Sequence, residues 1–506
     1  MKKTLYIAAG LMAAATGLTG CSDSFLDVTS PTQPTVKDYF TTDAHIQDGV
    51  VAAYDPLHWT DWAMNEYNPF TLMSDIMADD LWVGGSDRSD NSNWHMMMNF
   101  EARPNAVIAG LWTDAYSGVK RCNDVIQYIN ENDIPDMTET SARYYEAQVR
   151  VLRVFYYNWL WKFWGNVVYF DKNFEGEPYI GTQYTADEIY KFMVEDLEAA
   201  IALDALPMRE SADRAGRVTK AMAYMLYAEI VMYQNDQARY QKAFDYMKEI
   251  IDSPEYSLVE DYTTIFREEG EWNSESIWEI NYIDDNAVRS WIGPLNAGGT
   301  VLPTLISPSG WPGGTDGHDE GWGFAPVRQE TYDRYDPADP RRDATCWNAG
   351  AVGASYNQRY QDTGFFLEKY CAHTGDNADQ KADAQLNWNN NWRIYRYSET
   401  LLNAAELVLR GATGGSAQTY LDEVRGRVGL PSVSATLDNV LEERHLEFVG
   451  EGKRYWDLIR SGKASSVLVP DQYGYRTNSW SESKKYLPIP QSEIDKAQGT
   501  LKQNQY

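Results

Sequence analysis

Basic residues are scarce in this chain of 506 residues, which contains 44 Lys and Arg against 74 Asp and Glu. The formal net charge at pH 7 is −30, and the basic residues form no stripe along the sequence. Because nucleic-acid binding needs clustered Lys and Arg to neutralise phosphates, the charge balance argues against a nucleic-acid partner. The length predicts one very large domain or two to three closely packed lobes.

Common catalytic and metal-binding motifs are also missing. The sequence has no G-x-S-x-G elbow, no G-x-x-x-x-G-K-[ST] phosphate loop and no H-E-x-x-H zinc helix. No pair of histidines stands at ligand spacing; the six are His45, His58, His95, His318, His373 and His445. The segment "DGHDEG" (316–321) could offer Asp316, Asp319 and Glu320 to calcium, but it does not match an EF-hand loop. We therefore predict no metal site and no cofactor.

Long apolar runs are confined to the N-terminus. Lys2 and Lys3 precede the apolar stretch "TLYIAAGLMAAATGL", and "LTGC" (18–21) places small residues before a cysteine. "LTGC" resembles a bacterial lipobox, which implies that residues 1–20 are a lipoprotein signal peptide and that Cys21 carries the lipid. No later stretch reaches the roughly 18 uninterrupted apolar residues of a membrane helix.

Cysteine is too rare for a disulfide scaffold. With Cys21 lipidated, Cys122, Cys346 and Cys371 remain, an odd number that permits at most one bridge. A Cys346–Cys371 bridge and a set of buried free thiols are both compatible with the sequence.

Helical periodicity dominates what the chain does contain. In "GRVTKAMAYMLYAEIVMYQ" (216–234), Ala221, Met225, Ala228 and Met232 fall on one apolar stripe. A helix over 187–203 follows a capping box formed by Thr185 and Glu188. Further helices are predicted at 43–54, 105–130, 141–163, 238–252, 393–410, 416–427 and 436–449. Paired helices with short turns predict a mostly α fold on a tetratricopeptide-like helical-repeat scaffold.

Two long regions interrupt the helices, at 55–104 and 262–392. They are rich in Gly, Pro, Asn and Asp, which predicts irregular loops. The chain also has 18 Trp and 35 Tyr, residue types that suit half-exposed surfaces for gripping a ligand. Because long ordered loops in compact proteins are usually functional, these regions are the expected place for a binding site.

Near the C-terminus, Glu443, Glu447 and Glu451 recur at every fourth residue and stack like charges on one helix face. A catalytic cluster, a metal site and an ion-pair framework are the alternatives. Arg444 directly follows Glu443 and lies three residues before Glu447. Arg454 and Arg460 lie three residues before and three residues after Asp457. These offsets favour an ion-pair network within two short helices that meet at a bend at Gly450 and Gly452.

Several blocks, in this order, resemble the SusD/RagB family. They are "LWTDAYSGVKRCNDVI" (111–126), "ARYYEAQVRVLRVFYYNWLWKFWGNV" (142–167), "YRYSETLLNAAEL" (395–407), "LDEVRGRVGLP" (421–431) and the terminal "YLPIPQSEI" (486–494). The resemblance implies a lipid-anchored, surface-exposed outer-membrane protein that binds an oligosaccharide or polysaccharide without cleaving it. It also implies delivery of the ligand to a SusC-like TonB-dependent transporter.

The resemblance further implies how residues 21–506 are divided and where the ligand binds. It predicts a helical scaffold at about 40–260 and 393–460 and an irregular ligand-binding lobe at about 262–392. In the family, an early loop and a middle irregular segment supply the glycan site. The corresponding residues here are Trp82, Asp87, Arg88, Asn93 and Trp94, and Trp291, Trp311 and Trp322.

Two other functions remain open. One is a surface glycoside hydrolase, whose acid pair could not be identified in sequence because such carboxylates meet only in space. The other is a transporter lid for a nutrient that is not a glycan.

Overall fold

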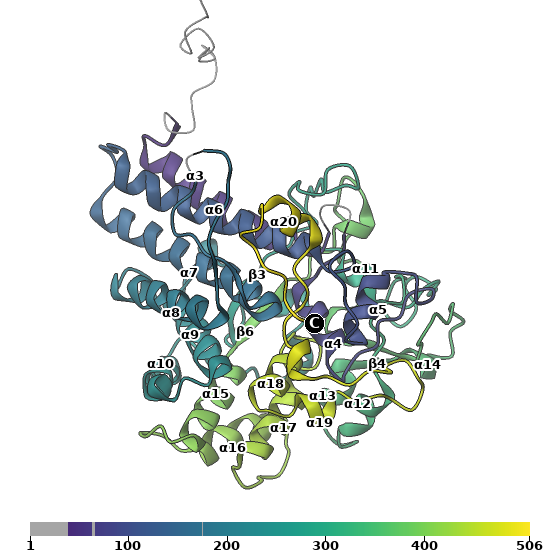
Figure 1. Ribbon diagram of the computed structural model, residues 1–506. Helices are drawn as coiled ribbons and strands as arrows, with labels where there is room; N and C mark the ends of the chain where they lie inside the picture. Colours follow the sequence, from purple (N-terminus) through teal and green to yellow (C-terminus); the bar gives the residue numbers. More distant parts are fainter. Residues whose placement is uncertain (1–38, 63–65, 175) are drawn as a thin grey trace, which may run out of the picture.

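A computed structural model describes residues 39–62, 66–174 and 176–506, so the predicted signal peptide and Cys21 lie outside the described residues. Helices dominate the described chain (Figure 1). The α-helices are α3 (Asp43–Tyr54), α4 (Phe70–Met77), α5 (Ser92–Met98), α6 (Ala109–Glu131), α7 (Glu139–Trp164), α8 (Ala186–Ala202), α9 (Lys220–Gln234), α10 (Tyr240–Asp252), α11 (Leu302–Ile306), α12 (Gln329–Arg334), α13 (Arg341–Thr345), α14 (Ala349–Val352), α15 (Tyr397–Leu409), α16 (Ala417–Arg427), α17 (Leu437–Glu447), α18 (Arg454–Arg460), α19 (Ala464–Val467) and α20 (Gln491–Lys496).

The strands are short and pair as antiparallel two-stranded sheets. They are β1 (Val167–Val168) with β2 (Gln183–Tyr184), β3 (Ser276–Ile280) with β6 (Trp392–Arg396), and β4 (Cys346–Asn348) with β5 (Phe365–Leu367).

The long helices pack in series on one side of the molecule (Figure 1). Helix α6 packs against α3 and α7, α7 against α8, α9 against α10, and α15 against α10 and α16. The predicted mostly α, tetratricopeptide-like fold is therefore confirmed. The capping box is also present: Thr185 N donates to Glu188 Oε2 at 2.9 Å, and Glu188 N donates to Thr185 Oγ1 at 3.3 Å.

Helix α7 forms much of the core. Every residue from Val151 to Trp164 is buried, including two cations. Arg153 pairs with Asp196 at 2.7 Å, and Lys162 pairs with Glu229, so neither charge is buried alone. None of the described helices is both long enough and apolar enough to cross a membrane.

The start of one predicted helix is wrong. Residues 393–396 were expected to be helical, but they belong to β6, and α15 begins only at Tyr397. Strand β6 pairs with β3, with Trp392 opposite Ile280 and Arg393 opposite Glu279. A backbone partner more than 100 residues away outweighs the local helical pattern here.

The two irregular regions lie against each other and form a loop-rich side next to the helical side (Figure 1). Trp82 N donates to Pro326 O at 3.0 Å, and Gly85 N donates to Gly323 O at 3.1 Å. Cys122, Cys346 and Cys371 are all buried free thiols, so the second cysteine alternative holds.

The stacked glutamates lie in what we call the buried ion network. Among the described residues it joins five acids to five bases: Glu275, Asp339, Glu443, Glu447 and Glu451 with Arg341, Lys369, Arg396, Arg425 and Arg427. The predicted ion-pair framework is therefore confirmed, although most of the predicted partners are wrong. Arg444 pairs with Asp457 and Glu399, and Arg454 pairs with Asp79. The bases that reach the stacked glutamates come from other parts of the chain.

Candidate functional site

Four half-buried aromatic residues meet on the loop-rich side and form what we call the aromatic platform: Trp62, Tyr67, Trp291 and Trp322. The ring centroids are 4.5 Å apart for Trp62 and Tyr67, 5.3 Å for Trp62 and Trp291, and 5.6 Å for Tyr67 and Trp322. Trp291 and Trp322 are 6.0 Å apart with an interplanar angle of 24°. That spacing is below the roughly 7–8 Å that two van der Waals contacts would need, so a flat ligand must lie across these rings rather than between them.

A buried ion pair holds the two halves of the platform together. Arg289, 2% exposed, donates to Asp61 Oδ1 at 2.6 Å and Oδ2 at 3.1 Å. The same guanidinium donates to the carbonyl of Trp62 at 2.7 Å and to that of Pro294 at 2.9 Å. Because one Arg side chain bonds to both segments, the loop that carries Trp291 is fixed relative to Trp62.

The loop at 283–295 exposes apolar side chains beside Trp291. Ile292 is 98% exposed, and Val288 and Leu295 are 47% and 42% exposed. Ser290 and Gly293 form the turn that presents Ile292, with Gly293 N donating to Ser290 O at 3.0 Å. Exposed apolar side chains gathered next to half-buried aromatic rings are typical of a ligand or partner surface.

Tyr67 adds a polar group to the platform. Burial, with a contribution from the nearby charge of Asp90, raises the pKa of Tyr67 to about 12. Its hydroxyl group therefore stays protonated at neutral pH and is available as a hydrogen-bond donor. From the core, Trp94 Nε1 donates to the Tyr67 carbonyl at 3.1 Å and fixes the backbone of this residue.

The predicted tryptophans fall into two groups. Trp291 and Trp322 belong to the aromatic platform, whereas Trp82, Trp94 and Trp311 are at most 2% exposed. The Arg328 guanidinium covers the Trp82 ring at 3.7 Å, and Trp311 packs edge-on against Trp347 at 4.7 Å. A sugar cannot stack on rings that the core already covers, so these three residues support the lobe from within.

The predicted polar residues of the early loop lie near its surface. The Asp87 carboxylate accepts from Ser89 N at 2.7 Å and shapes the turn, while Arg88 forms an exposed ion pair with Glu101 at 3.1 Å. Asn93 is half-buried in α5. Whether any of the three contacts a ligand stays a prediction.

Sequence reasoning missed Trp62 and Tyr67. Both lie in "TDWAMNEYNPF" (60–70), inside the region at 55–104 that was expected to be functional. The signal that could have found them is two aromatic residues among polar ones in an irregular segment.

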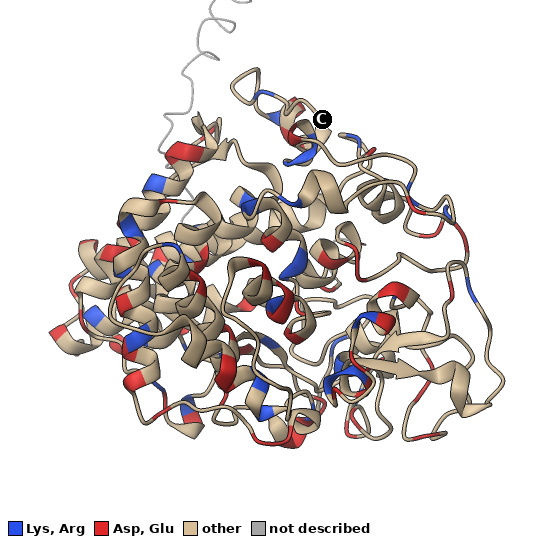
Figure 2. Cartoon of the chain, turned by 90° about the horizontal axis from the view of Figure 1, so that it is seen from below, with Lys and Arg blue, Asp and Glu red and all other residues tan. Residues whose placement is uncertain are grey.

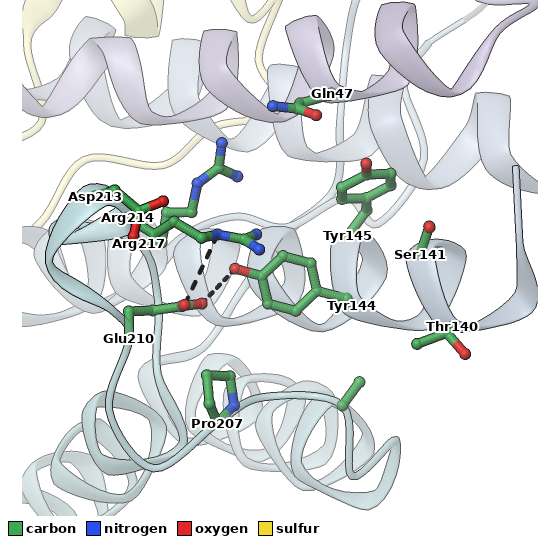
Figure 3. Close-up of a pocket in the computed structure, with 11 residues that line it drawn as sticks. Gln47, Thr140, Ser141, Tyr144, Tyr145, Pro207, Glu210, Asp213, Arg214 and Arg217 are labelled. Atoms are coloured by element: carbon green, nitrogen blue, oxygen red, sulfur yellow. Dashed lines mark hydrogen bonds and ion pairs between the residues drawn. The ribbon is translucent and has the colours of Figure 1, made fainter. Parts of the chain in front are cut away.

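A separate polar groove of about 620 Å³ lies on the helical side (Figure 3). Gln47 of α3 and Tyr144 and Tyr145 of α7 line it, opposite the loop that carries Glu210 and Arg214. Glu210 accepts a hydrogen bond from the Tyr144 hydroxyl, and the Arg214 guanidinium covers the Tyr144 ring at 4.8 Å. Since Arg214 already occupies that ring face, the groove is less suited to stacking than the aromatic platform.

Charge does not single out either place. Figure 2 shows Lys and Arg interspersed with Asp and Glu over the described chain. The formal net charge of −30 suits a neutral ligand better than a polyanion.

Two family models match the sequence. The model described as "SusD family" matches residues 274–506, and the model described as "Starch-binding associating with outer membrane" matches residues 24–232. The chain belongs to the SusD family.

Solved structures and a curated relative agree with this assignment. A surface glycan-binding protein A from Bacteroides thetaiotaomicron, solved in complex with laminarihexaose, is 67% identical with a TM-score of 0.89, covering 92% of this chain and 100% of that chain. Surface glycan-binding protein A from Bacteroides uniformis is 49% identical with a TM-score of 0.84, over 92% of this chain and 100% of that one. A SusD-like protein of Bacteroides ovatus is 22% identical over 93% of this chain and 85% of that protein.

Proposed function

We propose that this chain is a lipid-anchored outer-membrane protein that binds a glycan on the aromatic platform and delivers it to a SusC-like TonB-dependent transporter without cleaving it. The observation that best supports the binding role is the convergence of Trp62, Tyr67, Trp291 and Trp322 on one surface. We further propose that the irregular lobe at 262–392, together with 55–104, forms the ligand-binding part.

The chemistry of sugars fits such a surface. Pyranose rings present apolar C–H faces, which pack against Trp and Tyr rings, while their hydroxyl groups need polar partners. The platform offers ring faces over several residues, and the protonated Tyr67 hydroxyl is a donor. Because the rings form a surface rather than a slot, we expect a chain of several sugar units and not a single monosaccharide to be bound.

For the ligand itself we propose a laminarin-type β-glucan. The support is the 67% identical protein solved with laminarihexaose, together with a 28% identical laminarin-binding SusD-like protein whose TM-score is 0.83.

Isothermal titration with laminarihexaose tests the binding role. Single Ala replacements of Trp62, Trp291 and Trp322 should each weaken binding about 30-fold or more, since central aromatic contacts contribute about 2 kcal/mol or more. Tyr179→Ala is the control, because Tyr179 is 64% exposed and lies outside the platform. Melting curves of each variant separate lost binding from lost folding.

Four outcomes would contradict parts of this proposal. Unchanged affinity in all three Trp variants would reject the platform as the site, and loss of binding in Tyr144→Ala alone would assign the groove instead. Release of new reducing ends from laminarin during long incubation would favour the hydrolase. Co-purification with a large transporter but no response to any glycan would favour a lid for another nutrient.

The anchor needs its own test, because Cys21 lies outside the described residues. We expect the full-length protein to be found in the outer-membrane fraction and the Cys21→Ala variant to lose that association. An unchanged distribution of Cys21→Ala would contradict lipid anchoring at this residue.

A further inference from the structure

Two histidines and a glutamate that are distant in sequence meet in the loop-rich lobe: His318, Glu368 and His373. His318 Nε2 lies 2.9 Å from Glu368 Oε2, and His373 Nε2 lies 3.8 Å from Glu368 Oε1. One ligand atom from each residue falls within 4.8 Å of the other two. His318 and His373 are each 5% exposed, and the Glu368 side chain is 18% exposed.

The hydrogen bonds of His318 determine which of its nitrogens carries hydrogen. Its Nδ1 lies 2.8 Å from the carbonyl oxygen of Asp316, which can only accept, so Nδ1 must be the N–H. In neutral His318 the Nε2 lone pair then faces the Glu368 carboxylate at 2.9 Å. Two lone pairs at this distance need either a proton or a metal ion between them.

The neighbouring His373 favours the metal ion. Both of its ring nitrogens are buried, and neither makes a well-aligned hydrogen bond with a residue that the structure describes. The carbonyl groups of Gly317 and Glu368 lie near this ring, so one nitrogen can direct its hydrogen there while the other serves as a ligand. A neutral imidazole with one N–H and one free lone pair is the form that binds metals.

We propose that His318, Glu368 and His373 bind one zinc ion that joins the loop at 316–320 to the turn at 368–373. Two imidazoles and one carboxylate are a common ligand set for zinc, which binds such groups at about 2.0–2.2 Å and so places them roughly 3.3 Å apart. The observed separations of 2.9 and 3.8 Å lie on either side of that value. The hydrogen bond from His318 Nδ1–H to the Asp316 carbonyl is the kind of contact that orients a ligating histidine.

The residues around the three ligands also leave room for a cation. The His318 ring stacks on Trp347 with centroids 3.8 Å apart and an angle of 11°, which fixes its plane. Arg267 is the nearby cation, with Nη2 at 3.7 Å from Glu368 Oε1, but its side chain is 36% exposed and can turn toward solvent. A second group, Asp79, Asp80 and His445, is also compact, yet Arg454 already pairs with Asp79 at 2.8 Å, so it carries no proposal.

Metal analysis of the untagged protein tests the site. After chelator treatment and dialysis against zinc chloride, we expect about one zinc per chain and a higher melting temperature than in the zinc-free protein. His373→Ala and Glu368→Gln should each reduce bound zinc at least tenfold, whereas His45→Ala, which changes a histidine of α3 far from this lobe in sequence, should keep it. Cobalt provides a second readout, because tetrahedral Co²⁺ with these ligands absorbs visible light.

The results distinguish the alternatives even where a variant folds poorly. Absence of zinc and of a cobalt spectrum in the wild-type protein would overturn the proposal and leave a proton shared between His318 and Glu368. Equal zinc content in His373→Ala and wild type would overturn it as well. Neither result concerns laminarihexaose titration, so the zinc site and the aromatic platform can fail independently.

Discussion

Replacing Glu447 with Gln should destabilise the protein far more than the same change at a surface glutamate. The Glu447 carboxylate lies 2.9 Å from Arg341, 3.0 Å from Arg396 and 2.6 Å from Arg427, and its side chain is 0% exposed. Glutamine keeps the shape of the side chain but removes its charge. The buried ion network would then hold four acids against five bases, with one positive charge uncompensated.

The magnitude follows from this imbalance. Removing one partner of a buried ion pair costs about 3–5 kcal/mol. The entropy of unfolding is about 2.1 cal/mol/K per residue, or roughly 1 kcal/mol/K for a chain of this size, so the melting temperature should fall by about 3–5 °C. The control is Glu442→Gln, because Glu442 and Arg334 form a pair whose side chains are 43% and 39% exposed. An exposed pair contributes about 0–1 kcal/mol, which corresponds to about 1 °C or less.

Differential scanning calorimetry of the two variants at pH 7 measures both shifts. A double variant, Glu447→Gln with Arg427→Gln, restores equal numbers of acids and bases and should recover part of the loss. Equal melting temperatures for Glu447→Gln and Glu442→Gln would refute the reasoning, because the buried position of Glu447 would then have no energetic consequence. If the double variant lost more stability than the two single variants lose together, charge balance would also be rejected as the cause.

Two further predictions concern the stability of the protein at low pH and the effect of replacing glycines that have positive φ. Burial alone would raise the pKa of Glu229, but the charges of Lys162 and Lys453 lower it to about 2. The pKa of Glu447 also lies below its ordinary value despite burial, because of the charges of Arg427, Arg396 and Arg341. A carboxylate whose pKa is lower in the folded than in the unfolded state stabilises the fold at pH values above its unfolded pKa, so the free energy of unfolding should fall as the pH drops from about 4.5 toward 2. Urea unfolding midpoints across this pH range measure the fall, which should be smaller in Glu447→Gln than in the wild type. An identical fall in both proteins would exclude the Glu447 carboxylate as a source of the pH dependence. Gly450→Ala should lower the free energy of unfolding, measured in urea, more than Gly411→Ala does. Both glycines have positive φ, +80° at Gly450 and +108° at Gly411. A Cβ added at Gly450 would lie 2.4 Å from Leu367 Cδ1, whereas a Cβ added at Gly411 would have no described atom within 4 Å. The left-handed backbone conformation should make Gly411→Ala cost about 1–2 kcal/mol of stability, and overpacking against Leu367 should make Gly450→Ala cost about 1–3 kcal/mol more. Equal losses in the two variants would show that Leu367 moves aside without strain.

Helices with a clear apolar stripe were the most predictable part of the fold. The helix expected at 43–54 is α3 (Asp43–Tyr54), and that expected at 187–203 is α8 (Ala186–Ala202). A helix depends on contacts three and four residues apart, so its pattern is written locally. Strand β6 was missed because its partner β3 lies more than 100 residues earlier.

The candidate site was predictable as a region but not as a set of residues. Tryptophan in an irregular segment marks both a ligand surface and a core, and sequence cannot separate the two. Trp322 and Trp311 are only eleven positions apart, yet Trp322 is half-buried in the platform while Trp311 is 2% exposed. The difference comes from what packs over each ring, and those residues come from elsewhere in the chain.

The sequence by itself determined the helical scaffold, the two irregular regions, the likeness to the SusD family and the ion-pair role of the stacked glutamates. Only the tertiary structure decided which partners those glutamates have, which aromatic rings form a surface, and that His318 and His373 meet at Glu368. Helices and ion-rich segments leave local patterns because their defining contacts lie within a few residues. A ligand platform and a metal site consist of contacts between distant segments, and those contacts exist only once the core has brought the segments together.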